Sequence, residues 1–142
     1  MIETIKTKII TLIQSISDIQ FVYGFNKSTI EGYPYVIVTR STSTVEPADY
    51  SAVTKRLKRT YVFNIDLFIE MNEATFGTER SEEIAMGIID QILEKFDTDI
   101  TLTGSLLYST LTLEDTPRYV QNGNLENVAS FTFEGYTLIN SL

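Results

Sequence analysis

Apolar and polar residues alternate along residues 58–72 (KRTYVFNIDLFIEMN), and the prediction for the whole chain starts from this stretch. Every odd-numbered residue from position 61 to position 71 is apolar, whereas the positions between them include Asn64 and Asp66. A period of two over this length, rich in aromatic and β-branched residues, is typical of a strand with one buried face. At about 3.3 Å per residue, the strand is longer than most strands of a small domain. We therefore expect it to be the central strand, with one end projecting beyond the body of the domain.

Two other stretches repeat their apolar residues at steps of three and four, which is the spacing of one helix face. The first covers residues 2–18, where isoleucine dominates the stripe. The second begins at a cap provided by Thr78 or Ser81 and runs to about residue 96. Gly87 lies inside this second helix, where glycine costs about 1 kcal/mol relative to alanine. We interpret Gly87 as a sign of close packing against the sheet.

Shorter apolar runs predict the remaining strands at residues 21–23, 35–39, 106–113 and 128–139. Gly135 lies inside the last of these strands. A glycine there indicates either a β-bulge or a place where another backbone comes close.

These elements predict an α+β fold with a mostly antiparallel sheet of about four to five strands and two helices packed on one face. The length of 142 residues fits a single domain spanning residues 1–142. With no cysteine, the chain has no disulfide framework. No apolar run approaches the roughly 20 residues of a membrane span, and the first residues do not resemble a signal peptide. We therefore expect a protein made in the cytoplasm, with no membrane partner.

Residues 40–60 break the pattern, because they are mostly polar, contain Pro47 and follow neither the helix period nor the strand period. A connection of this length in a compact domain is usually functional or forms an extended arm. Two interpretations remain open from the sequence: a protruding hairpin or loop, and a disordered surface loop.

Charge is spread unevenly over a chain whose net charge is −8. Four of the 11 basic residues follow one another closely, and a group of acids comes at the start of the second helix. These seven residues are Lys55, Arg56, Lys58 and Arg59, followed by Glu79, Glu82 and Glu83. The acids are favoured by the positive end of the helix dipole.

The basic run has three interpretations. It can bind an acidic partner or nucleic acid, or it can be a solvated flank that discourages edge pairing. In a ring, each subunit offers one surface to a different surface of the next subunit. A basic arm on one copy would complement the acidic helix start of its neighbour. Under this third hypothesis, reversing all four basic residues to glutamate abolishes self-association.

Catalytic chemistry finds little support in the sequence. The chain has no histidine, and none of its seven glycines belongs to a phosphate-binding loop motif. Asp97 and Asp99 follow the second helix, where acids are usually solvated turn residues. We therefore expect no enzyme activity, no cofactor and no metal site.

Several segments resemble small tail-completion proteins of tailed bacteriophages, and in particular the tail terminator family of long-tailed phages. The resemblance covers nearly the whole chain and lies in the order and texture of its elements. The segments that carry it, after the isoleucine stripe of the first helix, are YPYVIV (33–38), KRTYVFNIDLFIE (58–70), SEEIAMGIIDQILEKF (81–96) and ASFTFEGYTLI (129–139).

The resemblance implies a structural virion protein at the head-proximal end of the tail. Tail terminators form a hexameric ring on the last ring of tail-tube subunits, stop tube growth and present a surface to the head connector. DNA would pass through the lumen without specific binding, which suits an acidic chain. Two alternatives remain: another neck or head-tail connector component, and a small non-enzymatic α+β module that uses residues 40–59 to bind a ligand.

Overall fold

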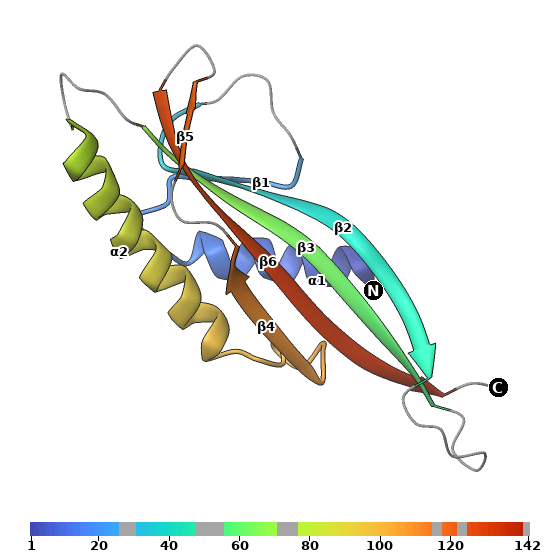
Figure 1. Ribbon diagram of the computed structural model, residues 1–142. Helices are drawn as coiled ribbons and strands as arrows, with labels where there is room; N and C mark the ends of the chain where they lie inside the picture. The colour runs from blue at the N-terminus through green and yellow to red at the C-terminus, as the bar shows by residue number, and fades with distance from the viewer. Residues whose placement is uncertain (26–30, 48–55, 71–76, 115–117, 122–124, 141–142) are drawn as a thin grey trace.

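A computed structural model describes residues 1–25, 31–47, 56–70, 77–114, 118–121 and 125–140. The chain folds into two helices and six strands (Figure 1). In chain order they are α1 (Ile2–Gln14), β1 (Phe21–Tyr23), β2 (Tyr35–Pro47), β3 (Arg56–Glu70), α2 (Gly77–Asp97), β4 (Tyr108–Leu113), β5 (Arg118–Gln121) and β6 (Leu125–Asn140).

All six strands belong to one sheet, ordered β1-β2-β3-β6-β4, with β5 also paired to β6. Only the β1–β2 pair is parallel among the strand pairs that the structure describes. The predicted α+β class with a mostly antiparallel sheet is therefore confirmed, and the stretch at 58–70 is the central strand β3. The sheet has one strand more than the predicted four to five, because β5 is only four residues long (RYVQ) and is too short to show an apolar period.

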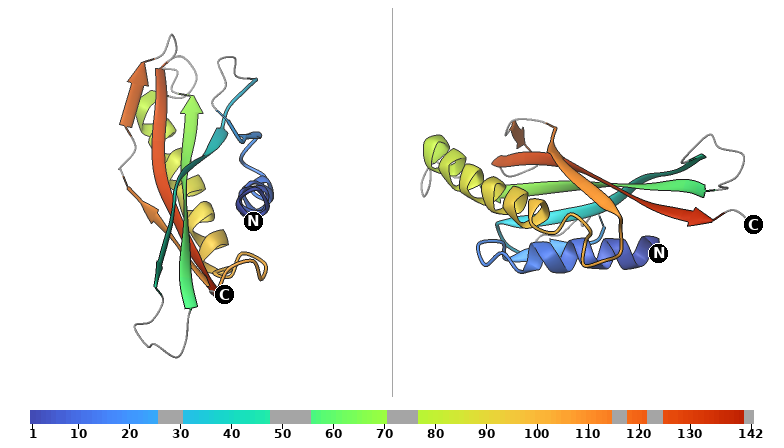
Figure 2. Two further views of the ribbon diagram at one scale, coloured as in Figure 1. Left: turned by 90° about the vertical axis from the view of Figure 1, so that its right-hand side faces the viewer. Right: turned by 90° about the horizontal axis from the view of Figure 1, so that it is seen from below.

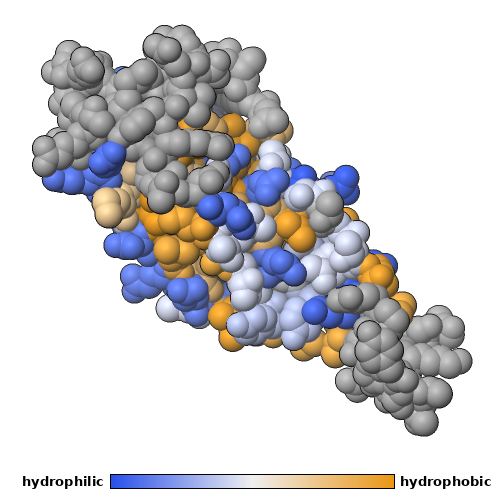
Figure 3. Space-filling view, viewed as in Figure 1, coloured by the Kyte–Doolittle hydropathy of each residue, from blue (hydrophilic) through white to orange (hydrophobic). Residues whose placement is uncertain are grey.

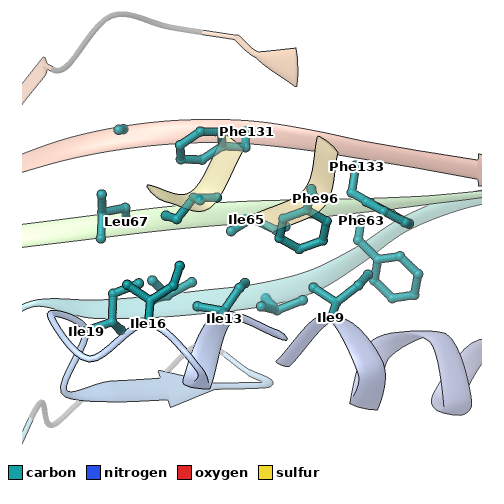
Figure 4. Close-up of a cluster of buried hydrophobic side chains, with 14 of the residues drawn as sticks. Ile9, Ile13, Ile16, Ile19, Phe63, Ile65, Leu67, Phe96, Phe131 and Phe133 are labelled. Carbon is teal, nitrogen blue, oxygen red and sulfur yellow. The ribbon is translucent and has the colours of Figure 1, made fainter. Parts of the chain in front are cut away.

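The hydrophobic core lies between one face of the sheet and both helices. The odd-numbered residues of β3 from Tyr61 to Ile69 are buried on this face, next to Phe131 and Phe133 of β6. Figure 4 shows the isoleucines of the first helix and the turn after it pointing toward these strand side chains. Phe96 of α2 completes the aromatic part of the core, with its ring centroid 5.6 Å from that of Phe133. Residues of both helices belong to this one core cluster, so both helices pack on the same face of the sheet, as predicted.

The helix α1 ends at Gln14, four residues earlier than its apolar spacing predicts. Ile16 and Ile19 continue the stripe and are buried, but they do so from a turn. The amide of Ile16 donates to the carbonyl of Ile13 (3.0 Å), a bond that spans three residues instead of four. Apolar spacing thus predicted which residues face the core, whereas the end of the helix depends on local hydrogen bonds.

The opposite face of the sheet is divided between polar and aromatic residues. A row of cross-strand neighbours in β2, β3, β6 and β4 carries Thr39, Asn64, Thr132 and Thr112. Figure 3 shows mostly pale and blue atoms over the middle of this face. Near β1, a second cluster contains the rings of Tyr35 and Phe68, stacked with centroids 4.6 Å apart.

The structure contradicts the interpretations of Gly87 and Gly135 that the sequence suggested. A Cβ placed on Gly87 would meet nothing within 4 Å, so this glycine faces open space and not the sheet. Gly135 pairs with Tyr61 without any shift of register, so it is not a bulge. A Cβ there would lie 2.4 Å from the Cδ1 atom of Leu106, so the close neighbour is a side chain and not another backbone.

Candidate assembly surface

The far halves of three strands form an arm that extends past the amino-terminal end of α1 and past β4 (Figures 1 and 2). We define the arm as residues 40–47 of β2, 56–61 of β3 and 136–140 of β6. The β2 and β3 segments pair as far as Pro47 and Leu57, and β6 pairs with β3 as far as Asn140 and Arg56. Of the two interpretations of residues 40–60, the protruding hairpin therefore describes residues 40–47 and 56–60, while 48–55 lie outside the described residues.

A β-bulge separates the arm from the body of β2. The register with β3 shifts between Arg40 and Ser43, which face Phe63 and Tyr61 respectively. Bulges bend and twist a strand, and they are common on sheet edges.

The strand alternation distributes the basic residues over both faces of the arm. Lys58 lies on the face away from the helices, where its Nζ atom is 4.6 Å from the ring centroid of Tyr136. The ring of Tyr136 is in turn 6.3 Å from that of Tyr108. This cation–π geometry stabilises the lysine by roughly 0.5–1 kcal/mol at an exposed site. Arg59 follows on the other face, between Val45 of β2 and Thr137 of β6.

The remaining predicted site residues lie elsewhere. Lys55 is outside the described residues, and Arg56 is the first residue of β3. Glu79, Glu82 and Glu83 belong to the first turns of α2, where Glu82 and Glu83 are exposed.

Figure 1 shows the start of α2 and the end of the arm at opposite ends of the molecule. The structure therefore does not bring the basic and acidic groups together within one copy. Contact between them would require two copies arranged end to end.

A groove of about 490 Å³ lies where the arm joins the body. Met1, Leu107 and Leu138 are exposed hydrophobic residues on its walls. The remaining lining residues are Gly104, Ser105, Leu106, Thr137 and Ile139. The groove is thus an apolar surface next to the end of β6.

One wall of the groove belongs to a turn with left-handed backbone. Three successive residues have positive φ, namely Leu102 (48°), Thr103 (56°) and Gly104 (83°). For a β-branched residue such as Thr103 this conformation is strained, and it persists only when its surroundings hold it. The Asp99 carboxylate accepts hydrogen bonds from the Thr103 amide (2.8 Å) and hydroxyl (3.2 Å).

Contacts with the core and with α1 also hold this turn in its conformation. Leu102 is fully buried, and the Nζ atom of Lys8 in α1 donates to the Thr103 carbonyl (3.3 Å) and to the Ser105 hydroxyl. Asp99 therefore has a structural role in the turn, as expected for an acid that follows a helix. Hydrogen bonds from Lys8 of α1 and to Asp99, which follows α2, thus hold this wall of the groove in place.

A second groove of about 340 Å³ runs along α2 beside Gly87. Two carboxylates line it, those of Asp18 and Glu83. The Asp18 carboxylate accepts a hydrogen bond from the Gln91 amide (2.8 Å), which links α2 to the turn after α1. The hydrogen bond gives Asp18 a structural role at this groove.

Among the described residues, no three acids, histidines or cysteines gather where they would hold a metal ion. Within the part of the chain that the structure describes, neither helix combines the length and the apolar character needed to cross a membrane.

Compared with known proteins, the sequence matches no protein-family model and has no significant match among curated proteins. A functional conclusion therefore depends on the geometry of this chain and on the resemblance of its segments.

The sequence did not predict the groove at the root of the arm. Its walls come from Met1, from residues 104–107 and from residues 137–139, which are far apart in the chain. On the opposite edge of the arm, Val45 is an isolated apolar residue within the polar segment STSTVE at 41–46. Val45 is 48% exposed in the structure.

Proposed function

We propose that the protein is a ring-forming structural component of a phage tail, namely a tail terminator that closes the head-proximal end of the tail tube. The observation that carries the proposal is the three-stranded arm. Beyond Tyr61, the last core residue of β3 in this direction, it extends past the helices that cover the rest of the sheet, so most of the arm lacks the helical layer that buries the body of β3. An arm of this kind suits a chain that works in an assembly.

The polar face of the sheet also supports the proposal. Its cross-strand row of threonine and asparagine offers hydroxyl and amide groups, and Glu134 adds an exposed carboxylate on the same face. In a ring with the helices outside and this face inside, the middle of the lumen wall would have little attraction for the phosphate backbone, because phosphate affinity comes mainly from lysine and arginine and Lys58 of this face lies on the arm. DNA would pass through such a lumen without being held.

Light scattering across a concentration series, followed by negative-stain imaging, tests the proposal. We expect closed rings with a central hole, either in free solution or on the ends of tail tubes polymerised from the cognate tube protein. Added to polymerising tubes, the protein should cap them and shorten their mean length. Tubes that keep growing at the same rate in its presence, with no ring at their ends, would exclude the terminator function.

A further inference from the structure

The arm has two sheet edges to which the structure assigns no strand partner among the described residues. β1 pairs with β2 only at residues 35–37, so residues 38–47 of β2 pair with β3 alone. On the other side, the ladder of β4 reaches β6 only as far as Tyr136, which accepts a last hydrogen bond from the Leu107 amide (3.0 Å). Residues 137–140 of β6 therefore pair with β3 alone. Such edges are templates for pairing with another strand.

The two edges are matched in direction. β3 is antiparallel to both β2 and β6, so β2 and β6 run the same way along the arm. Rotation about an axis parallel to the arm keeps strand direction. It therefore brings the β2 edge of one copy beside the β6 edge of the next as a parallel pair. This contact is heterologous, and repeated rotation closes it into a ring.

The two edges are also matched in height. Val45 and Thr137 both face Arg59 of β3, so they stand level on opposite edges of the same three strands. All three residues belong to the helix-facing side, because Tyr61 and Phe63 of the same β3 alternation are buried there. A neighbour related by rotation places its Val45 level with Thr137 and on the side where the groove opens.

From this match we infer that the groove at the root of the arm binds the β2 edge of a second copy of this chain, with Val45 of that copy in contact with Leu107, Thr137 and Ile139. The inference rests on the proposed function, because it specifies how neighbouring copies in the ring meet. Backbone hydrogen bonds along residues 137–140 supply the pairing, and the exposed side chain of Val45 supplies the apolar contact. The rigid turn at 102–104 keeps the groove open for this neighbour.

This arrangement differs from the charge hypothesis. Edge pairing places neighbouring arms side by side, whereas contact between the basic run and the start of α2 places copies end to end. A single planar ring can use only one of these two arrangements. The level positions of Val45 and the groove favour the side-by-side ring.

Disulfide trapping tests the inference, and the chain suits this method because it has no cysteine of its own. The double variant Val45→Cys, Thr137→Cys places one thiol on each edge. Within one copy the two positions are two strands apart, or roughly 9–10 Å between Cα atoms. A disulfide requires Cα atoms no more than about 7 Å apart, so any bond that forms must join two copies.

Under mild oxidation we expect a ladder of linked multimers on a non-reducing gel, ending at the number of copies in the ring. Each single variant should remain mostly unlinked, because a thiol on one edge meets no thiol on the other. The matched control is Met86→Cys with Thr137→Cys, since Met86 is also exposed to solvent (62%, against 48% for Val45) and lies on α2, outside the arm. This control should give no ladder.

The possible results separate the inference from the proposed function. Rings seen by imaging without a ladder above the control would overturn edge pairing and leave the terminator function standing. A ladder from free protein that does not cap tail tubes would support edge pairing and count against the terminator function. Dimers from a single variant, with no higher multimers from the double variant, would show a two-fold contact and overturn the inference. Absence of both rings and ladder, with tail tubes present, would overturn both.

A blocking variant gives a second measurement. Val45→Lys places a charge in the apolar groove and should leave the chain monomeric in light scattering at concentrations where the native chain assembles. Met86→Lys adds the same charge to α2 and should assemble normally. Because Val45 is exposed in the single copy, circular dichroism should show the same folded spectrum for both variants. Normal assembly of Val45→Lys would contradict the inference.

Discussion

At the scale of single residues, two glycines show how the same residue type serves opposite environments. Gly135 lies against the side chain of Leu106, which is almost fully buried. The side chains of Ser109 and Phe133 are also close to Gly135. Gly87 lies on the exposed side of a helix with open space around it. The same substitution to alanine should therefore change stability in opposite directions.

Gly135→Ala should destabilise the fold by about 1–3 kcal/mol, the usual cost of overpacking a close-packed interior. The added Cβ would lie 2.4 Å from Leu106 Cδ1 and 3.3 Å from Ser109 Cβ, so these neighbouring side chains must move. Urea denaturation measures the effect as a lower midpoint with an unchanged slope. The double variant with Leu106→Ala should recover part of the loss that the two single changes predict together. A midpoint equal to that of the native chain would mean that Leu106 moves aside at no cost.

Gly87→Ala should stabilise the chain by up to about 1 kcal/mol, which is the difference in helix propensity between the two residues. No described atom opposes the new methyl group within 4 Å. Thermal denaturation of the monomer measures the change as a rise of the midpoint. A lower midpoint would show that the groove beside α2 is smaller in solution than in the structure.

At the scale of elements, the sequence predicted those that have one buried face. In β3 each odd-numbered residue from Tyr61 to Ile69 is buried in the core, so burial itself produces the period of two. Residues 40–47 make up more than half of β2 and show no such period, because the residues of this segment whose burial is described are exposed on both faces. Alternation can reveal a strand only where a second layer covers it.

The groove could not be predicted for a different reason. Its walls combine the first residue of the chain, a turn after α2 and the end of β6. No local pattern reports which distant segments a fold will bring together. By contrast, the basic run was visible in the sequence, and the structure assigns Lys58 and Arg59 to opposite faces of β3.

The helix α1 should depend on the sheet for its existence. It spans 13 residues, and no side chain caps its first turn. Ile5, Ile9 and Ile13 are fully buried, and β-branched residues are modest helix formers. Isolated helices shorter than about 12–15 residues are marginal in water.

A peptide with the sequence of Ile2–Gln14 should therefore show little helical circular dichroism in water. Trifluoroethanol should induce the helix, because it removes the competition of water for backbone hydrogen bonds. In the full chain, Ile9→Ala should lower stability by about 2–5 kcal/mol, since it leaves a cavity in the core. A strongly helical peptide in water would show that α1 forms without its docking partner.

At the scale of the whole molecule, the side-by-side and end-to-end arrangements respond to salt in opposite ways. End-to-end contact joins a basic arm to an acidic helix start, so screening would weaken it. Side-by-side contact places like charges together, because every arm carries Lys58 and Arg59 at the same height and every copy has a net charge of −8. Screening would then relieve repulsion between copies.

We therefore expect assembly to become stronger when NaCl rises from about 0.1 M to about 1 M, which shortens the Debye length from about 10 Å to about 3 Å. Analytical ultracentrifugation across this range measures the association constant directly. For the same reason, the reversal of Lys55, Arg56, Lys58 and Arg59 to glutamate should leave side-by-side rings in place, because like charges still face like charges after the reversal. The original charge hypothesis requires the opposite for both experiments, with weaker assembly at high salt and none after the reversal. In that case, a further reversal of Glu79, Glu82 and Glu83 to lysine would restore assembly and establish the end-to-end contact.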